Sequence, residues 1–176
     1  KAVGGVFAFS PDEKYLVYGR YKGLNDIAVI RLEDMKVIMV LQHHNDYVNF
    51  IEFSHDGRFM ASVSADKQLI LWDVSKDRFR EIRSFGGFDA SLYQASFSMD
   101  DRFLVTGDSR GNVLVLEREG GNYREFQRFQ YRRHSLEAAV FHPRKEEFIT
   151  GSLYGYRRYR LHGKEFRISD STELNA

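Results

Sequence analysis

The sequence contains no cysteine and no Asn-x-Ser/Thr glycosylation acceptor, and it has no apolar run of the roughly 18 residues that a membrane span requires. Without cysteine the chain can form no disulfide, no thiolate metal site and no sulfur nucleophile. Nothing in it resembles a secretory signal peptide. These absences predict an intracellular protein, cytoplasmic or nuclear, with no membrane partner.

The chain also lacks an excess of charge of either sign. It has 26 Lys and Arg against 25 Asp and Glu. Residues 121–176 hold 11 of the basic and 7 of the acidic residues, which leaves 15 against 18 for residues 1–120. No global field therefore steers the protein toward nucleic acid, although its last third is locally basic.

A helical period is missing as well. Short runs rich in Val, Ile, Leu, Phe and Tyr alternate with polar turns, which is a strand pattern. The clearest example gives four predicted strands in succession: Tyr47 to Phe53, Phe59 to Ser64, Gln68 to Asp73, and Phe79 to Phe85. The fourth run carries more charge, as expected of an outer edge strand.

What the sequence does have is a repeat. The tetrapeptide Phe-Ser-x-Asp begins at Phe9, Phe53 and Phe97, each 44 residues after the last, and a degenerate Phe-His-Pro copy begins at Phe141. A constant period of this length indicates an array of equivalent units, each unable to bury its apolar face alone. We therefore expect these four phenylalanines, each at the end of a first strand, to have equivalent surroundings.

Four-stranded antiparallel units that repeat radially are the blades of a β-propeller. The predicted fold class is all-β, with four such blades and almost no helix. The predicted blades span residues 1–42, 43–86, 87–131 and 132–176, all within one propeller domain.

Residues of the second unit stand at the spacings of a WD repeat: His44, Val48, Phe53, Ser54, Asp56, Gly57, Ser62, Asp66, Trp72 and Asp73. The chain thus resembles the WD-repeat β-propeller family over essentially its whole length. The resemblance implies a buried, hydrogen-bonded tetrad of His44, Ser62, Asp66 and Trp72. A buried indole N–H needs an acceptor, and an imidazole can relay between a hydroxyl and a carboxylate, so the implied tetrad is chemically reasonable.

The other units depart from this tetrad. Counting in steps of 44 puts Phe88, Thr106, Arg110 and Leu116 at its positions in the third unit, and Arg132, Thr150, Tyr154 and Arg160 in the fourth. We expect those units to be held mainly by apolar packing. Propellers of this family usually close with seven blades, about 308 residues at this period. We therefore expect the chain to be a segment of a longer propeller, or a partner to supply the remaining blades.

No set of residues points to catalysis, a metal or a cofactor. Ser62, His44 and Asp66 are the residue types of a hydrolytic triad, but no Gly-x-Ser-x-Gly turn exposes the serine. The histidines are scattered over different turns without metal-ligand spacing. We therefore predict a protein that is not an enzyme and holds no cofactor or metal.

The resemblance also implies where partners dock: beside the start of each first strand and at the turn between the second and third strands. In this sequence the candidate partner-binding residues there are Tyr21, Tyr47, Asn49, Lys67, Tyr93, Ser109, Glu137 and Leu153. Tyr47 and Tyr93 are the expected anchors, because tyrosine gives a large rigid contact at little entropic cost. The predicted function is a non-catalytic protein–protein interaction scaffold within a larger assembly or multidomain protein.

The fourth unit suggests an alternative, because it interleaves arginines with tyrosines. Aromatic faces for stacking beside guanidinium groups for phosphate are what RNA binding uses. The candidate basic patch consists of Arg132, Arg133, Arg157, Arg158 and Arg160. The competing interpretations are an RNA-associated scaffold, a solvated charged edge, and arginines that pair with acidic residues of a neighbouring blade.

Overall fold

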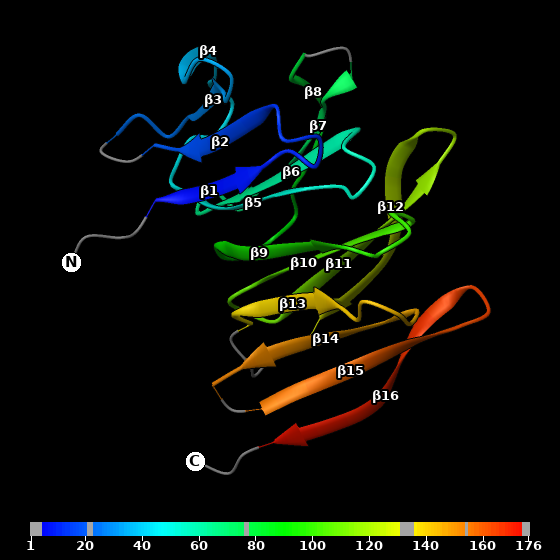
Figure 1. Ribbon diagram of the computed structural model, residues 1–176. Helices are drawn as coiled ribbons and strands as arrows, with labels where there is room; N and C mark the ends of the chain where they lie inside the picture. Colours follow the sequence, from blue (N-terminus) through cyan, green and yellow to red (C-terminus); the bar gives the residue numbers. More distant parts are fainter. Residues whose placement is uncertain (1–4, 21–22, 76–77, 131–135, 154, 174–176) are drawn as a thin grey trace. The chain divides into compact units, whose positions relative to one another are not determined.

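The computed structural model describes residues 5–20, 23–75, 78–130, 136–153 and 155–173, and it contains sixteen strands and no α-helix within those ranges (Figure 1). The strands form four antiparallel sheets of four strands, and in each sheet the strands are adjacent in chain order. The predicted all-β class with four-stranded antiparallel units is confirmed. The chain divides into two compact units, residues 1–87 and residues 88–176, and each is described separately.

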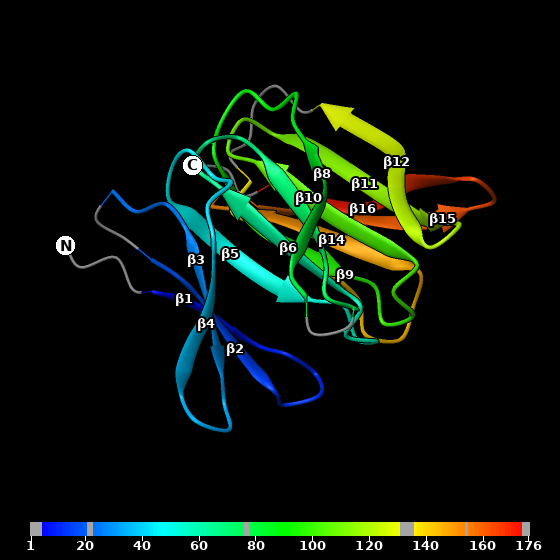
Figure 2. The ribbon, with the colours of Figure 1, turned by 90° about the horizontal axis from the view of Figure 1, so that it is seen from above.

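The first unit contains two sheets. Their strands are β1 (Val6–Phe9), β2 (Tyr15–Gly19), β3 (Ile27–Arg31) and β4 (Lys36–Leu41), then β5 (Val48–Phe53), β6 (Phe59–Ser64), β7 (Leu69–Asp73) and β8 (Arg80–Phe85). Consecutive strands are joined by hairpin turns, and the β1–β2 and β3–β4 turns extend from the same end of their sheet (Figure 2).

One apolar core joins the two sheets of the first unit. Val17 and Val29 of the first sheet are fully buried in a cluster that also contains Ile51, Met60 and Trp72 of the second. Ring contacts connect the sheets as well: Phe79 packs edge-on against Tyr15 of the first sheet and against Phe53 of its own, at centroid distances of 5.4 and 6.3 Å. The alternation of strands β5 to β7 thus turns the Phe53 face of the second sheet toward the first.

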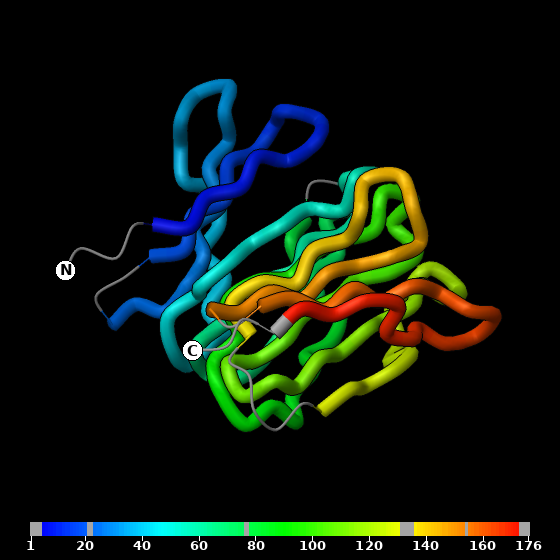
Figure 3. The backbone as a smooth tube through the Cα atoms, turned by 90° about the horizontal axis from the view of Figure 1, so that it is seen from below, coloured from blue at the N-terminus to red at the C-terminus, as the bar shows by residue number. Residues whose placement is uncertain are grey.

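The second unit repeats this plan. Its strands are β9 (Leu92–Phe97), β10 (Phe103–Asp108), β11 (Asn112–Glu119) and β12 (Asn122–Gln130), then β13 (Ala138–Phe141), β14 (Glu147–Ser152), β15 (Gly155–His162) and β16 (Glu165–Glu173). The backbone trace shows β13 to β16 as consecutive hairpins (Figure 3).

Aromatic rings fill the core between the two sheets of the second unit. Phe103 contacts Phe141 and Phe166, at centroid distances of 6.3 and 5.1 Å, and Phe148 stacks on Tyr159 at 4.4 Å. Gln127 of β12 adds a polar connection, because its side-chain amide both donates to the carbonyl and accepts from the N–H of Phe166 in β16. The two outer strands of this unit are therefore joined directly.

The prediction of equivalent surroundings for the four phenylalanines is wrong for Phe9. Phe53, Phe97 and Phe141 are buried, with 7%, 3% and 6% of their surface exposed, whereas Phe9 is 64% exposed. Phe53 and Phe141 face the sheet that precedes theirs within the same unit, and Phe97 packs against Tyr123 of its own sheet at a centroid distance of 5.7 Å. Within the described residues no sheet precedes β1, so nothing covers Phe9.

Phe9 belongs to a larger uncovered apolar face of the first sheet. The pairing register places two cross-strand rows on this face: Phe9, Leu16, Ile30 and Val37, and Phe7, Tyr18, Ala28 and Val40. Phe7 and Val37 are 57% and 58% exposed. We call these eight residues the β1–β4 outer face.

Candidate functional site

The four predicted tetrad residues form one hydrogen-bonded chain in the second sheet. The indole Nε1 of Trp72 donates to Ser62 Oγ over 2.9 Å, and Ser62 Oγ lies 2.8 Å from His44 Nε2. His44 Nδ1 lies 2.9 Å from Asp66 Oδ2. Since a carboxylate only accepts and the indole only donates, Ser62 Oγ accepts from Trp72 and His44 Nδ1 donates to Asp66.

Asp66 connects this chain to the backbone of two loops. Its carboxylate accepts from the N–H of Asn45, before β5, and from the N–H of Gln68, after the β6–β7 turn, at 2.9 and 3.0 Å. Burial raises the pKa of Asp66, but the hydrogen bonds from His44 and these amides outweigh burial and hold the pKa below its ordinary 3.8. The ionised carboxylate is therefore the form that ties the loops together.

Burial leaves this chain no route to a substrate. Ser62 is fully buried and Trp72 is 1% exposed, in the core between the first two sheets. A nucleophilic serine has to reach the bond that it attacks. The arrangement of Ser62, His44 and Asp66 therefore acts as a structural lock of the loops.

In the third sheet, the corresponding two loops are connected by a residue that counting in steps of 44 did not select. Asp108, at the end of β10, is fully buried, and one of its oxygens accepts from the N–H groups of Asp89 and Ala90 before β9, at 2.9 and 3.2 Å. The other oxygen accepts from the N–H groups of Arg110 and Asn112 in and after the β10–β11 turn, both at 2.9 Å.

Asp108 stands two positions before Arg110, the residue that strict 44-residue counting puts in the place of Asp66. The sequence did contain an indication of this role of Asp108. A carboxylate ends the second strand of the repeat, and the turn after it contains Gly111, whose φ of 90° favours glycine. A glycine precedes it, and a side chain at Gly107 would lie 2.9 Å from Leu136 and 3.0 Å from the carbonyl of Asn112. Tight local packing fixes this turn.

The first sheet contains a third buried carboxylate at the corresponding end. Asp26, just before β3, is 1% exposed and receives two hydrogen bonds of 2.6 Å from the guanidinium of Arg20, just after β2. Such a bidentate pair fixes both the distance and the orientation of the segments that it joins. Asp26, Asp66 and Asp108 are termed the loop-locking carboxylates below.

The predicted partner-binding residues of the second and third sheets stand at or next to these locked loops, and Glu137 and Leu153 stand at the strand ends of the fourth sheet. Tyr47 and Tyr93 are 47% and 46% exposed, and Leu153 is 71% exposed. Lys67 and Glu137 are also exposed, whereas Asn49 and Ser109 are half-buried. Tyr21 lies outside the described residues.

Backbone hydrogen bonds bring some of these positions together. The carbonyl of Tyr47 accepts from the N–H of Ala65 in the turn that contains Lys67, at 2.9 Å. In the second unit, the N–H of Ser109 donates to Ser91, and the N–H of Glu137 donates to Gly151. A single face shared by the residues of the two units stays a prediction.

Lys67 has an unusual backbone conformation. Its φ is 69°, in the left-handed region that side chains disfavour, whereas the residues 44 positions before and after it are Gly23 and Gly111, with φ of 81° and 90°. The turn geometry therefore repeats, and of these three turns only the one in the second sheet has a residue with a side chain at this position.

The predicted basic patch is not one surface in the described part of the fourth sheet. Strand alternation puts Arg158 and Arg160 on one face of β15 and Arg157 on the other, with the buried Tyr159. The guanidinium of Arg160 lies 3.2 Å from the carboxylate of Glu147. Burial raises the pKa of Glu147, but Arg160 and Lys145 lower it below 4.5. Arg132 and Arg133 lie outside the described residues.

The described residues hold no group of three or more His, Cys, Asp and Glu side chains placed to bind a metal ion. They also include no helix with the length and apolar character needed to cross a bilayer.

Comparison with known proteins identifies the repeat. The family model described as WD domain, G-beta repeat matches residues 35–73, which contain all four residues of the tetrad. The chain is 30% identical over 107 residues to Jouberin of Mus musculus, an alignment that covers 59% of this chain and 10% of that protein. It is 34% identical over 68 residues to the WD repeat-containing protein 26 homolog of Arabidopsis thaliana, covering 38% of this chain and 12% of that one.

A further relative is Autophagy-related protein 18 of Dictyostelium discoideum, 24% identical over 116 residues, with 64% of this chain and 31% of that protein covered. The chain thus spans about a tenth of Jouberin and less than a third of the other two proteins. The family match over residues 35–73, these similarities and the four four-stranded antiparallel sheets support a WD-repeat family for the chain, and members of that family are in general protein-interaction scaffolds.

Proposed function

We propose that the chain serves, without catalysis of its own, as the rigid scaffold on which a protein segment docks within a larger intracellular assembly, cytoplasmic or nuclear. The single observation that carries this proposal is the pairing of exposed tyrosines with locked loops. Tyr47 and Tyr93 are each nearly half exposed, and each stands beside a buried carboxylate that fixes its loop.

Rigidity matters here for a physical reason. A loop that must be ordered upon binding loses conformational entropy, which weakens the complex. Asp66 and Asp108 have already ordered these loops, with backbone hydrogen bonds of 2.9–3.2 Å. Exposed aromatic side chains on such loops present contact area with little further entropic penalty.

Site-specific photo-crosslinking tests the proposal. The photoreactive residue p-benzoylphenylalanine replaces Tyr47 or Tyr93 in cells that make the protein. Control positions at the opposite strand ends are Met35, which is 65% exposed, and Arg124, which is also exposed. We expect one and the same protein to be captured at 47 and 93 and not at the controls. Equal capture at all four positions, or none, contradicts the proposal.

The RNA-associated alternative has its own test. Phosphate contacts would make RNA affinity fall steeply with salt. A labelled single-stranded RNA titrated at increasing salt, with Arg157→Ala and Arg158→Ala as variants, measures that slope. Since these two arginines lie on opposite faces of β15, no observation on the described residues favours this function over the protein scaffold.

A further inference from the structure

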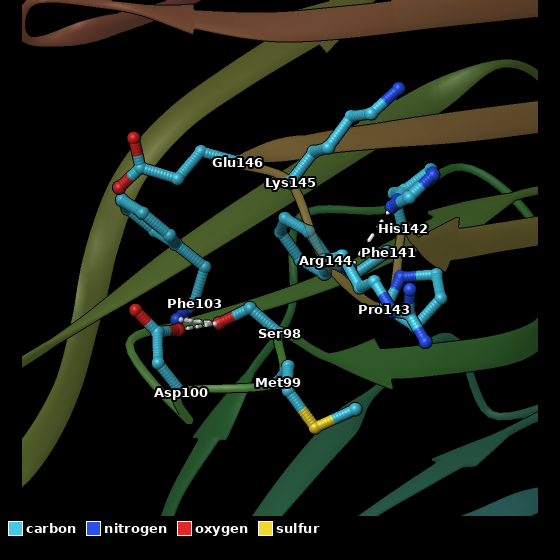
Figure 4. Close-up of a pocket in the computed structure, with 10 residues that line it drawn as sticks. All are labelled: Ser98, Met99, Asp100, Phe103, Phe141, His142, Pro143, Arg144, Lys145 and Glu146. Carbon is cyan, nitrogen blue, oxygen red and sulfur yellow. Dashed lines mark hydrogen bonds between the residues drawn. The ribbon is translucent and has the colours of Figure 1, made fainter.

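The second unit contains a cavity at the strand ends opposite Tyr93 and the Asp108 lock. It opens between the β9–β10 turn of the third sheet and the β13–β14 turn of the fourth and has a volume of about 270 Å³ (Figure 4). The buried rings of Phe103 and Phe141 form its apolar part, and Met99, which is 54% exposed, lies at its rim.

The size of the cavity indicates what could occupy it. Small-molecule and cofactor sites generally measure roughly 300–1,000 Å³, so this cavity is below that range. A single large apolar side chain needs less room and gains from contact with aromatic rings. The cavity therefore suits one anchor residue of a protein segment.

The charge at its rim is reversed relative to the other three repeats. In those repeats the turn after the first strand pairs a serine hydroxyl with a carboxylate: Ser10 with Asp12, Ser54 with Asp56, and Ser98 with Asp100, at 2.7, 2.8 and 2.7 Å. The fourth repeat has Arg144 at the carboxylate position. There His142 stands at the serine position, and its ring accepts the N–H of Arg144 through Nδ1, at 3.0 Å.

This replacement leaves the guanidinium of Arg144 outside the turn's own hydrogen bonding. The other charges at the rim are already engaged. Asp100 accepts from Ser98 and from the N–H of Arg102, Glu146 pairs with the Arg102 guanidinium at 3.2 Å, and Lys145 lies 3.7 Å from Glu147. Within the described ranges, Arg144 makes no ion pair.

Figure 4 shows how these charges are distributed. Asp100 and Glu146 lie on one side of the cavity, near Phe103, whereas Arg144, Pro143 and His142 lie on the other. An occupant that enters over the Pro143 side thus meets an unpaired cation next to an apolar recess. A guanidinium fork matches a carboxylate bidentately, which favours an acidic occupant over a neutral one.

We propose that this cavity binds an acidic–apolar protein segment, with a large apolar side chain against Phe103 and Phe141 and a neighbouring carboxylate on Arg144. The inference rests on the proposed scaffold function, because it assumes that the chain binds protein. It is nevertheless separable, since the cavity and Tyr93 lie at opposite ends of the strands in the second unit, and Tyr47 belongs to the first unit. Crosslinking at 47 and 93 reports on the tyrosine positions, and the experiment below reports on the cavity.

A charge-reversal selection tests the inference. A random heptapeptide library displayed on phage is selected on the full chain and, in parallel, on the Arg144→Glu variant. The peptide most enriched on the unmodified chain is then synthesised with a fluorescein label. It is titrated by fluorescence polarisation against the unmodified chain, Arg144→Glu, Arg144→Lys and Met99→Glu. Lys164→Glu, an equal charge change in the exposed β15–β16 turn, is the control.

We expect peptides with an acidic residue beside a large apolar one from the unmodified chain and basic–apolar peptides from Arg144→Glu. Affinity for the labelled peptide should fall about tenfold in Arg144→Glu and in Met99→Glu, less in Arg144→Lys, and not at all in Lys164→Glu. Selection of no peptide, peptides without an acidic residue, or equal affinity for Arg144→Glu and the unmodified chain overturns the inference. Melting curves of each variant establish that it is folded.

Discussion

The second and third sheets connect the same pair of loops by different chemistry. In the second sheet, Asp66 is reached through the side chains of Trp72, Ser62 and His44. In the third, Asp108 binds the backbone directly through four N–H groups, and a leucine, Leu116, stands at the tryptophan position. Both sheets have a buried carboxylate between two loops. The side chains of Trp72, Ser62 and His44 are therefore one of at least two ways to hold such a carboxylate in place.

The largest effect that separates the two locks is expected from Trp72→Ala. The side chain is 1% exposed, so its removal leaves a large cavity and takes the donor from Ser62. The free energy of unfolding should fall by about 3–5 kcal/mol, measured by denaturant titration. Ser62→Ala, which keeps the ring but removes its acceptor, should lose about 1–3 kcal/mol. A loss below about 1 kcal/mol for Trp72→Ala would contradict the structural role.

The next effect tests the lock of the third sheet. Asp108→Ala leaves four backbone N–H groups without their acceptor, and we expect about 3 kcal/mol less stability, again by denaturant titration. Arg110→Ala is the matched control, because Arg110 occupies the position that counting by 44 would select. It is exposed, so its substitution should change the stability by less than about 0.5 kcal/mol. If Arg110→Ala proved the more harmful change, the assignment of the lock to Asp108 would be wrong.

A smaller effect depends on pH. Asp66→Asn should lower the stability by about 1–2 kcal/mol at neutral pH, because charge-assisted hydrogen bonds are replaced by neutral ones. Since the pKa of Asp66 is lowered from 3.8 in the folded state, its stabilisation is complete above 3.8 and is lost as the pH falls below it, through the folded pKa. Denaturation curves of both proteins from neutral pH to pH about 2.5 should therefore converge at the acid end. A difference that stays constant over this range would show that the charge of Asp66 is not what stabilises the loops.

The smallest effect has the opposite sign. Lys67→Gly should raise the free energy of unfolding by about 0.5–1 kcal/mol, because glycine adopts the φ of 69° without strain. The larger conformational entropy of glycine in the unfolded chain offsets part of this gain. Glu13→Gly is a matched change in another turn: its φ is 58°, and the residue 44 positions later is Gly57, with φ of 70°. Thermal unfolding of both variants measures the gain. Destabilisation in both would show that the repeated turn geometry is not what sets the preference.

Much of this architecture could be predicted from the sequence because the repeat and the strand alternation are both local patterns. Equal spacing from Phe9 to Phe141 predicted four units, and polar turns between apolar runs predicted their strands. A buried indole and a buried imidazole need hydrogen-bond partners, and Trp72 and His44 each have one in Ser62.

The remaining features depend on contacts that spacing does not encode. Asp108 lies two residues from its expected place, because a carboxylate can reach the same loop amides from either end of a tight turn. The exposure of Phe9 depends on which sheet lies against its own, and the repeat gives Phe9 and Phe53 the same local sequence. Arg157 and Arg158 lie on opposite faces of β15 because side chains alternate along a strand, and their closeness in sequence does not show this.

Because of the β1–β4 outer face, the stability of this chain depends on the concentration of whatever molecule covers that face. Eight apolar residues on four paired strands, with Phe7, Phe9 and Val37 more than half exposed, form a surface that gains free energy from any cover. Whatever covers this face binds the folded state and not the unfolded one, so the measured midpoint of unfolding rises with the concentration of the covering molecule. A melting temperature for this protein has meaning only together with the concentration of the protein and of whatever covers this face.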